Sequence, residues 1–162
     1  VADLPESEPI PGMGGGMPVG GFVSSAEYMD LLSDHPKLGH ITTFGGHPVI
    51  AAACLATLQE LIETNLIAET LEKEKLFRKL LVHPLIKEIR GRGLMLAPMT
   101  ESAEITNQII LKCQDKGLIL FWLLFEGKAI RITPPLTISN QEIEEGCQIM
   151  IEVMNEILES QN

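Results

Sequence analysis

One arginine stands out as a candidate ligand-binding residue because it interrupts an apolar segment. Arg131 lies between Ile130 and Ile132, shortly before the Pro134-Pro135 pair. A guanidinium at the end of a buried strand needs an anionic partner, because an unpaired buried charge is costly. That partner is either an internal carboxylate, from Glu126 or from the C-terminal helix, or a substrate carboxylate held through two parallel hydrogen bonds. The residues themselves leave both interpretations open.

A second candidate site is the loop Thr42-Thr43-Phe44-Gly45-Gly46-His47, which directly precedes Pro48. Proline suits the first position of a helix, so this loop places two hydroxyl groups and two glycines at a helix N-terminus. The unpaired N–H groups and the dipole at such an end attract an anion such as phosphate. Plain capping of the helix is an equally good interpretation of the same residues.

A third candidate is the glycine-rich run Gly12-Met13-Gly14-Gly15-Gly16. Glycines allow several backbone N–H groups to converge on one anion, so the run could hold a phosphate. It lacks the Gly-Lys-Ser/Thr ending of a P-loop, and Pro18 stands where the helix of a nucleotide-binding motif should begin. Taken alone, the run is more typical of a structural hinge.

The remaining residue types that could do chemistry form no recognisable set. We expect turn and cap roles for the scattered histidines, and small buried positions for cysteines that lie far apart in apolar helical patterns. No metal site and no nucleophile–histidine pair is predicted, because no ligand spacing is present. These residues are His35, His40, His47 and His83, with Cys54, Cys113 and Cys147.

Periodicity and capping signals predict the elements that must position these residues. The proline- and glycine-rich first 21 residues are predicted to be loop. The predicted fold class is α/β, in the form of an α+β sandwich whose helices pack on one small, mostly antiparallel sheet. Helices are expected over residues 24–32, 48–64, 65–82 and 103–116 and from Ser139 onward, a hairpin around Gly91-Arg92-Gly93, and a buried strand Leu118–Phe125 that pairs with residues 129–132 across Glu126-Gly127-Lys128.

Composition excludes several functional classes. The chain has 162 residues, 45% of them apolar, with 12 basic and 22 acidic side chains and a net charge of −10. Without a basic face, it is not expected to bind nucleic acid. Its longest nearly uncharged apolar stretch, Leu118–Phe125, is far shorter than the about 20 residues that cross a membrane, so no membrane partner is expected. No secretory signal is visible, and we therefore expect a cytoplasmic protein.

Taken together, the three candidate sites and one hairpin resemble a known family. In order and spacing they are similar to the C-terminal half of class III, fold-type-I, pyridoxal-phosphate-dependent aminotransferases, the group of the ornithine, acetylornithine and 4-aminobutyrate enzymes. The resemblance covers about residues 12–160. The segments that carry it are residues 12–20 (GMGGGMPVG), residues 40–48 (HITTFGGHP), residues 91–95 (GRGLM) and residues 130–136 (IRITPPL).

The resemblance implies a domain organisation and a set of roles. Residues 1–11 are an acidic, proline-rich leader unlike the family, residues 12–64 match a remnant of the large domain, and residues 65–162 match the small C-terminal α/β domain. Thr43 would bind the phosphate of pyridoxal 5'-phosphate across the interface of a homodimer, and Arg131 would bind the carboxylate of an amino acid or 2-oxo acid substrate. Thr42, Gly14 and Gly15 complete the implied cofactor-binding residues.

The resemblance fails at one position that is essential for the reaction. The family has its Schiff-base lysine immediately before the glycine-rich run, where this chain has Pro11. Because proline has no amine that can form an imine, the chain alone is expected to hold no cofactor and to be inactive, as a fragment of an aminotransferase that lacks the lysine and the N-terminal half. The alternative is a stand-alone, non-catalytic protein-association domain. As a fragment, the chain should expose the apolar face of helix 48–64 and associate.

Overall fold

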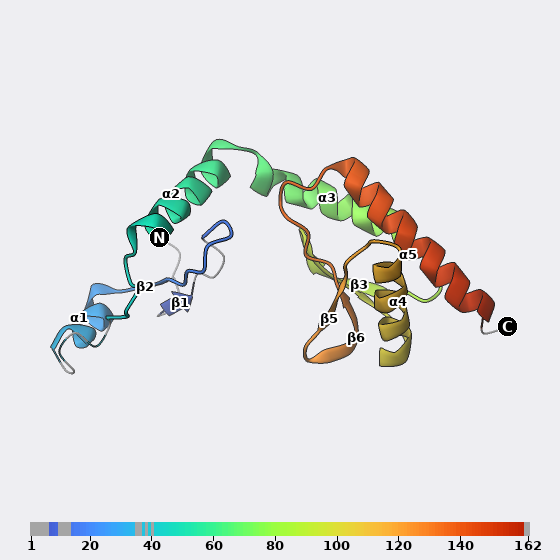
Figure 1. The fold of residues 1–162 in the computed structure, drawn as a ribbon, viewed down its shortest axis with the longest axis horizontal. Coiled ribbons are helices and arrows are strands. Elements are labelled where there is room, and N and C mark those ends of the chain that lie inside the picture. Colours follow the sequence, from blue (N-terminus) through green and yellow to red (C-terminus); the bar gives the residue numbers. More distant parts are fainter. Residues whose placement is uncertain (1–6, 10–13, 35–36, 38, 40, 161–162) are drawn as a thin grey trace. The chain divides into compact units, whose positions relative to one another are not determined.

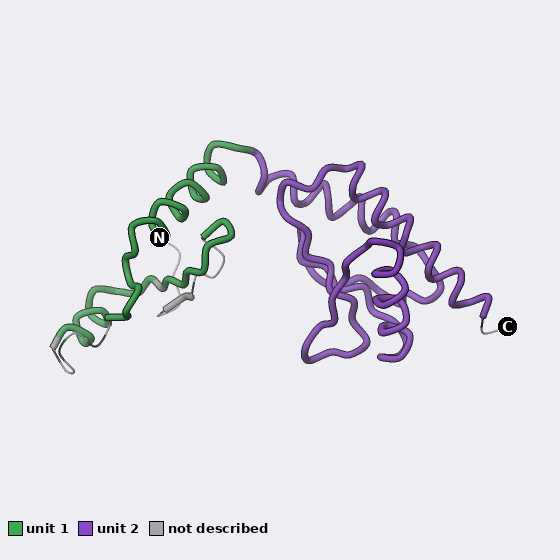
Figure 2. The backbone as a smooth tube through the Cα atoms, in the orientation of Figure 1, with its two compact units in different colours: residues 1–64 green, residues 65–162 purple. Residues whose placement is uncertain are grey.

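The computed structural model describes residues 7–9, 14–34, 37, 39 and 41–160. The contacts divide the chain into two compact units, residues 1–64 and residues 65–162 (Figure 2). Both units contain segments that the sequence analysis singled out. The first unit holds the glycine-rich run and the threonine loop, and the second holds the strand that ends at Arg131.

In its described residues, the first unit contains two short strands and two helices (Figure 1). Strands β1 (Ser7–Pro9) and β2 (Phe22–Ser24) pair antiparallel and are followed by α1 (Ala26–Asp34) and α2 (Pro48–Glu63). The prediction that the first 21 residues are all loop was wrong at β1. A two-stranded ribbon tolerates a proline at a strand end, because an edge residue needs no ladder N–H donor.

Helix α2 begins at Pro48, as predicted, and ends at Glu63. The Ala51 N–H donates to the His47 carbonyl at 2.9 Å, and the Thr64 N–H closes the last turn on Glu60 at 3.2 Å. None of its residues is buried within this chain. Ile62, for example, is 79% exposed, so much of the apolar surface of this helix is uncovered in the described structure.

The second unit is built on a four-stranded antiparallel sheet. The predicted hairpin around Gly91-Arg92-Gly93 is confirmed, and the sheet as a whole is small and antiparallel, as expected. The strand order is β3-β4-β6-β5, so β3 and β5 are the edges. The strands are β3 (Glu88–Arg92), β4 (Met95–Met99), β5 (Phe121–Leu123) and β6 (Glu126–Arg131).

The predicted buried strand Leu118–Phe125 was wrong in length and in burial. Only Phe121–Leu123 is a strand, and Phe125 is fully exposed at the turn into β6. The segment is apolar, but it lies at a sheet edge, where a strand has a neighbour on one side only. The order of the strands depends on distant parts of the chain, so the hydrophobicity of this segment alone cannot predict that it lies at the edge.

Three helices bury one side of this sheet: α3 (Leu66–Leu80), α4 (Ala103–Asp115) and α5 (Asn140–Ser160). The predicted capping box of α5 is confirmed, because the Glu142 N–H donates to Ser139 Oγ at 3.2 Å and the Ser139 N–H donates to Glu142 Oε2 at 2.8 Å. Helix α4 ends at Asp115, close to the predicted stop at Gly117. The Gly117 N–H donates to the Gln114 carbonyl at 3.0 Å, and the Leu118 N–H donates to the Cys113 carbonyl at 2.9 Å.

The core of the second unit lies between the sheet and these helices. Helix α4 packs on β6 and on α5, and α5 packs on α3. The apolar face of α5 is buried and forms the centre of the cluster. Fully buried members include Ile109, Ile130, Ile143, Met150, Met154 and Ile157. The expected fold class is thus confirmed as a mixture of helices and sheet.

Candidate functional site

Arg131 is the last residue of β6, and its side chain is half-buried. The antiparallel register places Phe121 of β5 directly opposite, and Arg131 Cζ lies over the Phe121 ring, 4.7 Å from the ring centre. The guanidinium Nε is buried and finds no hydrogen-bond partner among the described residues. A donor of this kind is costly to bury unless an acceptor arrives from outside the unit.

The internal carboxylates that the sequence offered to Arg131 are engaged elsewhere. Glu126 Oε1 accepts from the Lys128 N–H at 3.1 Å, and Glu142 Oε2 accepts from both the N–H and the hydroxyl of Ser139 at 2.8 Å. These two bonds from Ser139 lower the pKa of Glu142 below its usual value. Within the part of the chain that the structure describes, no carboxylate forms an ion pair with Arg131. The internal-partner interpretation therefore finds no support, and a carboxylate from outside remains.

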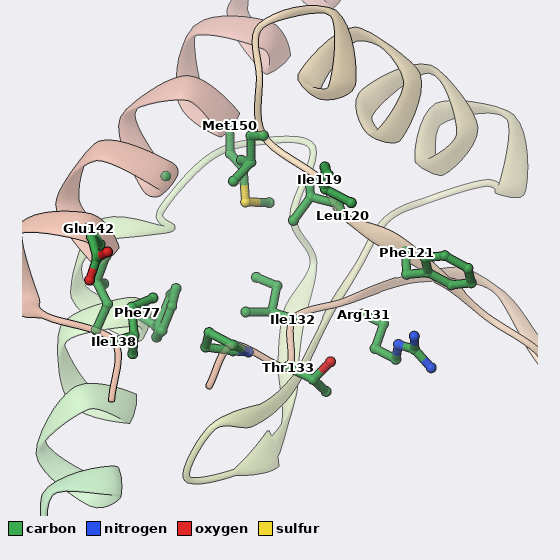
Figure 3. Close-up of a pocket in the computed structure, with 14 residues that line it drawn as sticks. Phe77, Ile119, Leu120, Phe121, Arg131, Ile132, Thr133, Ile138, Glu142 and Met150 are labelled. Atoms are coloured by element: carbon green, nitrogen blue, oxygen red, sulfur yellow. The ribbon is translucent and has the colours of Figure 1, made fainter. Parts of the chain in front are cut away.

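A cavity of about 270 Å³ lies beside the end of β6. In Figure 3, Phe121 and Arg131 lie together on one side of it, whereas Phe77, Ile138 and Glu142 lie on the opposite side. Its walls are mainly apolar side chains from α3, α5 and the segment around β5. The arrangement places the Arg131 cation on one side, the Glu142 carboxylate on the other and apolar surface between them, so its Arg131 side suits a ligand carboxylate and its walls suit a hydrocarbon part.

The threonine loop of the first unit forms two successive tight turns. The Gly45 N–H donates to the Thr42 carbonyl at 3.1 Å, and the His47 N–H donates to the Phe44 carbonyl at 3.2 Å. His47 makes no side-chain cap on α2, and neither threonine hydroxyl has a hydrogen-bond partner among the described residues. An uncapped helix N-terminus beside two such hydroxyls can receive an anion. The plain capping interpretation is weakened, because no side chain in this loop caps the helix.

The glycine-rich run turns tightly and packs on α2. The Met17 N–H donates to the Gly14 carbonyl at 3.0 Å. A Cβ atom at Gly15 would lie 2.3 Å from Thr57 Oγ1, so only glycine fits at this distance from the helix. This packing explains the glycine without a ligand. Gly12 and Pro11 lie outside the described residues.

The two loops of the first unit meet only in part. A hollow of about 580 Å³ is lined by Pro18, Val19 and Gly20 from one loop and by Thr42 and neighbouring residues from the other. Thr43, Gly14 and Gly15 are not among its lining residues. The structure thus brings Thr42 close to the end of the glycine-rich run and leaves Thr43 exposed on the turn.

The other candidate residues have structural roles. Burial raises the pKa of the Cys113 and Cys147 thiols to about 12, so both remain protonated and unreactive at neutral pH. His83 Nδ1 accepts from the Leu85 N–H at 3.2 Å, which fits the predicted turn role. His35 and His40 lie outside the described residues. Where side chains are described, no three metal-ligating groups gather.

The sequence analysis missed Phe121, which contacts Arg131, and Lys73, which contacts the segment after it. Phe121 contacts Arg131 across the β5–β6 pair, but the predicted turn over residues 126–128 would have placed Leu123 opposite Arg131 instead. Lys73 of α3 is only 7% exposed and donates to the Leu136 carbonyl at 2.7 Å, in the segment that follows Arg131. No local signal identifies Lys73, because its partner lies 63 residues away.

No single helix in the described part of the chain is long and apolar enough to cross a membrane. The consecutive helices α2 and α3 meet the length and composition requirement only when they are counted together.

Known proteins that share the sequence pattern and the fold of this chain are aminotransferases. The family model for class III aminotransferases matches residues 11–154. Acetylornithine aminotransferase from Caldanaerobacter subterraneus subsp. tengcongensis is 35% identical over 152 residues, which cover 90% of this chain and 37% of that protein. The chain therefore belongs to the class III, pyridoxal-phosphate-dependent aminotransferase family, in the group of the ornithine and acetylornithine enzymes.

Solved structures agree with this assignment. Ornithine aminotransferase from Toxoplasma gondii superposes with a TM-score of 0.83 at 26% identity, covering 96% of this chain and 38% of that one. N-acetylornithine aminotransferase from Stenotrophomonas maltophilia, at 21% identity and a TM-score of 0.80, shares the fold over 97% of this chain and 41% of its own. The chain spans about two fifths of the length of the relatives that it matches.

Proposed function

We propose that this chain is the C-terminal part of a class III aminotransferase, and that it contributes the arginine that binds the substrate carboxylate. The observation that supports this role is the state of Arg131, which is half-buried, has an unpaired Nε and has no carboxylate partner among the described residues. Transfer of an amino group between an amino acid and a 2-oxo acid is the activity of the complete polypeptide.

In that enzyme, Arg131 holds the substrate by its carboxylate. A guanidinium presents parallel N–H donors that match the two oxygens of a carboxylate, so it fixes orientation as well as position. Holding a substrate in one orientation lowers the entropic part of the barrier to reaction. The residue binds and orients the substrate, and it moves no proton itself.

The residues present fit the phosphate group of the cofactor, but they do not supply the lysine that would bind it covalently. The uncapped N-terminus of α2, with Thr42 and Thr43 beside it, has the donors that a phosphate group requires. We assign these threonines to the phosphate of pyridoxal 5'-phosphate, shared with a second subunit in a homodimer. Gly14 and Gly15 shape the neighbouring loop. When bound, the cofactor supplies an electron sink for bond cleavage at the α-carbon of the substrate.

The covalent part of the cofactor site is not matched, because Pro11 stands where the family has its lysine. We therefore propose that the chain alone holds no pyridoxal phosphate covalently and catalyses no amino transfer. The purified chain should be mixed with pyridoxal phosphate, reduced with borohydride and weighed by mass spectrometry. We expect no stoichiometric adduct, and one lysine modified in full on the folded chain would contradict the proposal.

The role of Arg131 can be tested separately on the chain as it is. 2-Oxoglutarate should shift the NMR resonances of Arg131 and its neighbours in a saturable titration. Arg131→Met keeps the apolar stem and removes the charge, so it should abolish this response. Arg90→Met is the matched control, because Arg90 is an exposed arginine already paired with Glu88. Equal binding by the wild-type chain and the Arg131 variant would remove Arg131 from the site.

A second candidate function is a stand-alone domain for protein association without catalysis. It is favoured by α2, an apolar helix with no buried residue in this chain. This function predicts specific binding of another protein and no response to 2-oxoglutarate, whereas the aminotransferase role predicts the saturable response at Arg131.

A further inference from the structure

Phe121 has a position that core packing does not explain. It is the first residue of the edge strand β5, and its side chain is 50% exposed. Its ring meets the Trp122 ring edge-on, with centres 5.9 Å apart, and Trp122 is in turn packed against the core. The ring is therefore supported from one side and directed at the guanidinium of Arg131 on the other (Figure 3).

The ring of Phe121 attracts the positive charge of the Arg131 guanidinium, but it forms no hydrogen bond with the N–H donors of that group. The face of an aromatic ring carries negative potential and attracts a cation, without accepting the in-plane N–H groups as a carboxylate would. The Nε of Arg131 is unpaired in the described structure, as expected if the ring orients the group without occupying its donors.

We propose that Phe121 is a positioning residue that holds the Arg131 guanidinium ready for a carboxylate ligand. The inference rests on the proposed function of Arg131 and adds the residue that orients it. A free arginine side chain populates many rotamers and loses this freedom on binding. Because the ring already restricts those rotamers in the free chain, Arg131 loses less conformational entropy when the ligand binds.

The chain offers a matched set of variants for the test. Phe121→Leu removes the ring and keeps an apolar side chain, whereas Phe121→Tyr keeps the ring. Phe125→Leu is the control, because Phe125 lies at the end of the same hairpin, is fully exposed and has no contact with Arg131 among the described residues. The amide spectrum of each variant reports whether the fold of the second unit is intact.

Two readouts separate the positioning role from the binding role. The first is the chemical shift of the Arg131 Nε–H without ligand, because an aromatic ring at this distance displaces it through its ring current. The second is the dissociation constant for 2-oxoglutarate. We expect Phe121→Leu to move the shift toward its value in a free arginine and to weaken binding about two- to five-fold, the equivalent of an exposed cation–π contact. Phe121→Tyr and Phe125→Leu should behave as the wild-type chain.

An unchanged Nε–H shift in a folded Phe121→Leu variant would overturn the positioning role, whatever the affinity. So would an equal loss of affinity in Phe121→Tyr or Phe125→Leu. If Phe121→Leu changes the shift but the wild-type chain does not bind 2-oxoglutarate, the orientation of Arg131 by the ring is supported and the proposed carboxylate role is contradicted instead. If Phe121→Leu fails to fold, Phe121→Tyr and Phe121→Trp are compared instead. Both variants keep an aromatic ring but differ in its size, and the same two quantities, the Nε–H shift and the dissociation constant, are measured.

Discussion

Arg131 has no carboxylate partner among the described residues, although the sequence offered Glu126 and the carboxylates of the C-terminal helix as candidates. Glu126 accepts a hydrogen bond from Lys128, and Glu142 closes the capping box of α5 with Ser139. The sequence identified Arg131 from its apolar neighbours, because a charge in an apolar strand is conspicuous. It did not identify Phe121 or Lys73, whose roles depend on strand register and on a contact between distant segments.

Lys73 should stabilise the segment that follows Arg131. Its Nζ donates to the Leu136 carbonyl at 2.7 Å and pairs with Glu69 at 3.1 Å, and its side chain is almost fully buried. Lys73→Met keeps the stem and leaves the carbonyl without its donor, so it should cost about 1–3 kcal/mol of unfolding free energy.

Urea unfolding measures this cost, with Lys75→Met as control. Lys75 pairs with Glu72 on the exposed face of the same helix, and an exposed pair contributes little. Equal unfolding midpoints for the two variants would contradict a stabilising role for the buried Nζ.

At the scale of elements, short sequence patterns were sufficient to predict the ends of helices, because capping and stop residues act locally. The start of α2 at Pro48, the capping box of α5 and the end of α4 just before Gly117 all follow from short patterns, and all are confirmed. The strand Leu118–Phe125 was predicted to be buried from its hydrophobicity alone. Its edge position is a property of the strand order, which no segment of the sequence carries by itself.

The β3–β4 hairpin should depend strictly on Gly91, which lies in β3 and pairs with Leu96 of β4. This glycine has φ of 102°, and a Cβ there would lie 2.0 Å from the Met95 carbonyl oxygen. Gly117 has φ of 86°, but a Cβ there would meet nothing within 4 Å, so it shares the backbone strain without the clash. Gly117→Ala should cost about 1–2 kcal/mol, and Gly91→Ala should cost more. Thermal unfolding of both variants tests this, and a smaller effect at Gly91 would contradict the geometry.

Glu74 of helix α3 accepts a hydrogen bond from the β3–β4 hairpin. This contact should make the stability of the second unit depend on pH. The Gly93 N–H, 2.6 Å from Glu74 Oε2, and then Arg78 hold the pKa of this carboxyl below its ordinary value of 4.5. A lowered pKa means that the stabilisation is complete above the unfolded-state value and is lost as the pH falls through the folded-state value. Glu74→Gln should therefore flatten the loss of stability on acidification.

Urea midpoints measured from neutral pH down to below 4.5 give the comparison for Glu74. Glu72→Gln, on the exposed side of α3, serves as control. The account of Glu74 fails if the wild-type chain and Glu74→Gln lose stability in parallel as the pH falls.

At the scale of the whole molecule, the chain covers about two fifths of the length of its relatives. Its first unit contains α2, an apolar helix with no buried residue in the described structure. An exposed apolar face of this kind favours association. Sedimentation velocity should show association that increases with concentration. Leu55→Glu with Ile62→Glu, both on α2, should weaken it, whereas Val82→Glu, at an exposed apolar residue outside α2, should not. A monomer at all concentrations would contradict this expectation.

Family, fold and the order of the functional segments could all be predicted from four short motifs, because these motifs keep the order and spacing of the family. The proposed phosphate role of Thr43 and the proposed carboxylate role of Arg131 could not be tested by sequence alone, since each needs a bound ligand, and the chain covers only 37% of its acetylornithine relative. The departure at Pro11 is visible only against the family pattern.

The central claim, that this chain is part of a larger aminotransferase, is tested most directly by the mass of the native polypeptide. Peptides from residues 46–160 identify the product in the source cell, and intact-mass analysis then gives its size. We predict a polypeptide of more than twice 17.8 kDa, because the chain covers only 37% of its acetylornithine relative. A native product of 17.8 kDa that begins with the leader would contradict the claim and favour the association role.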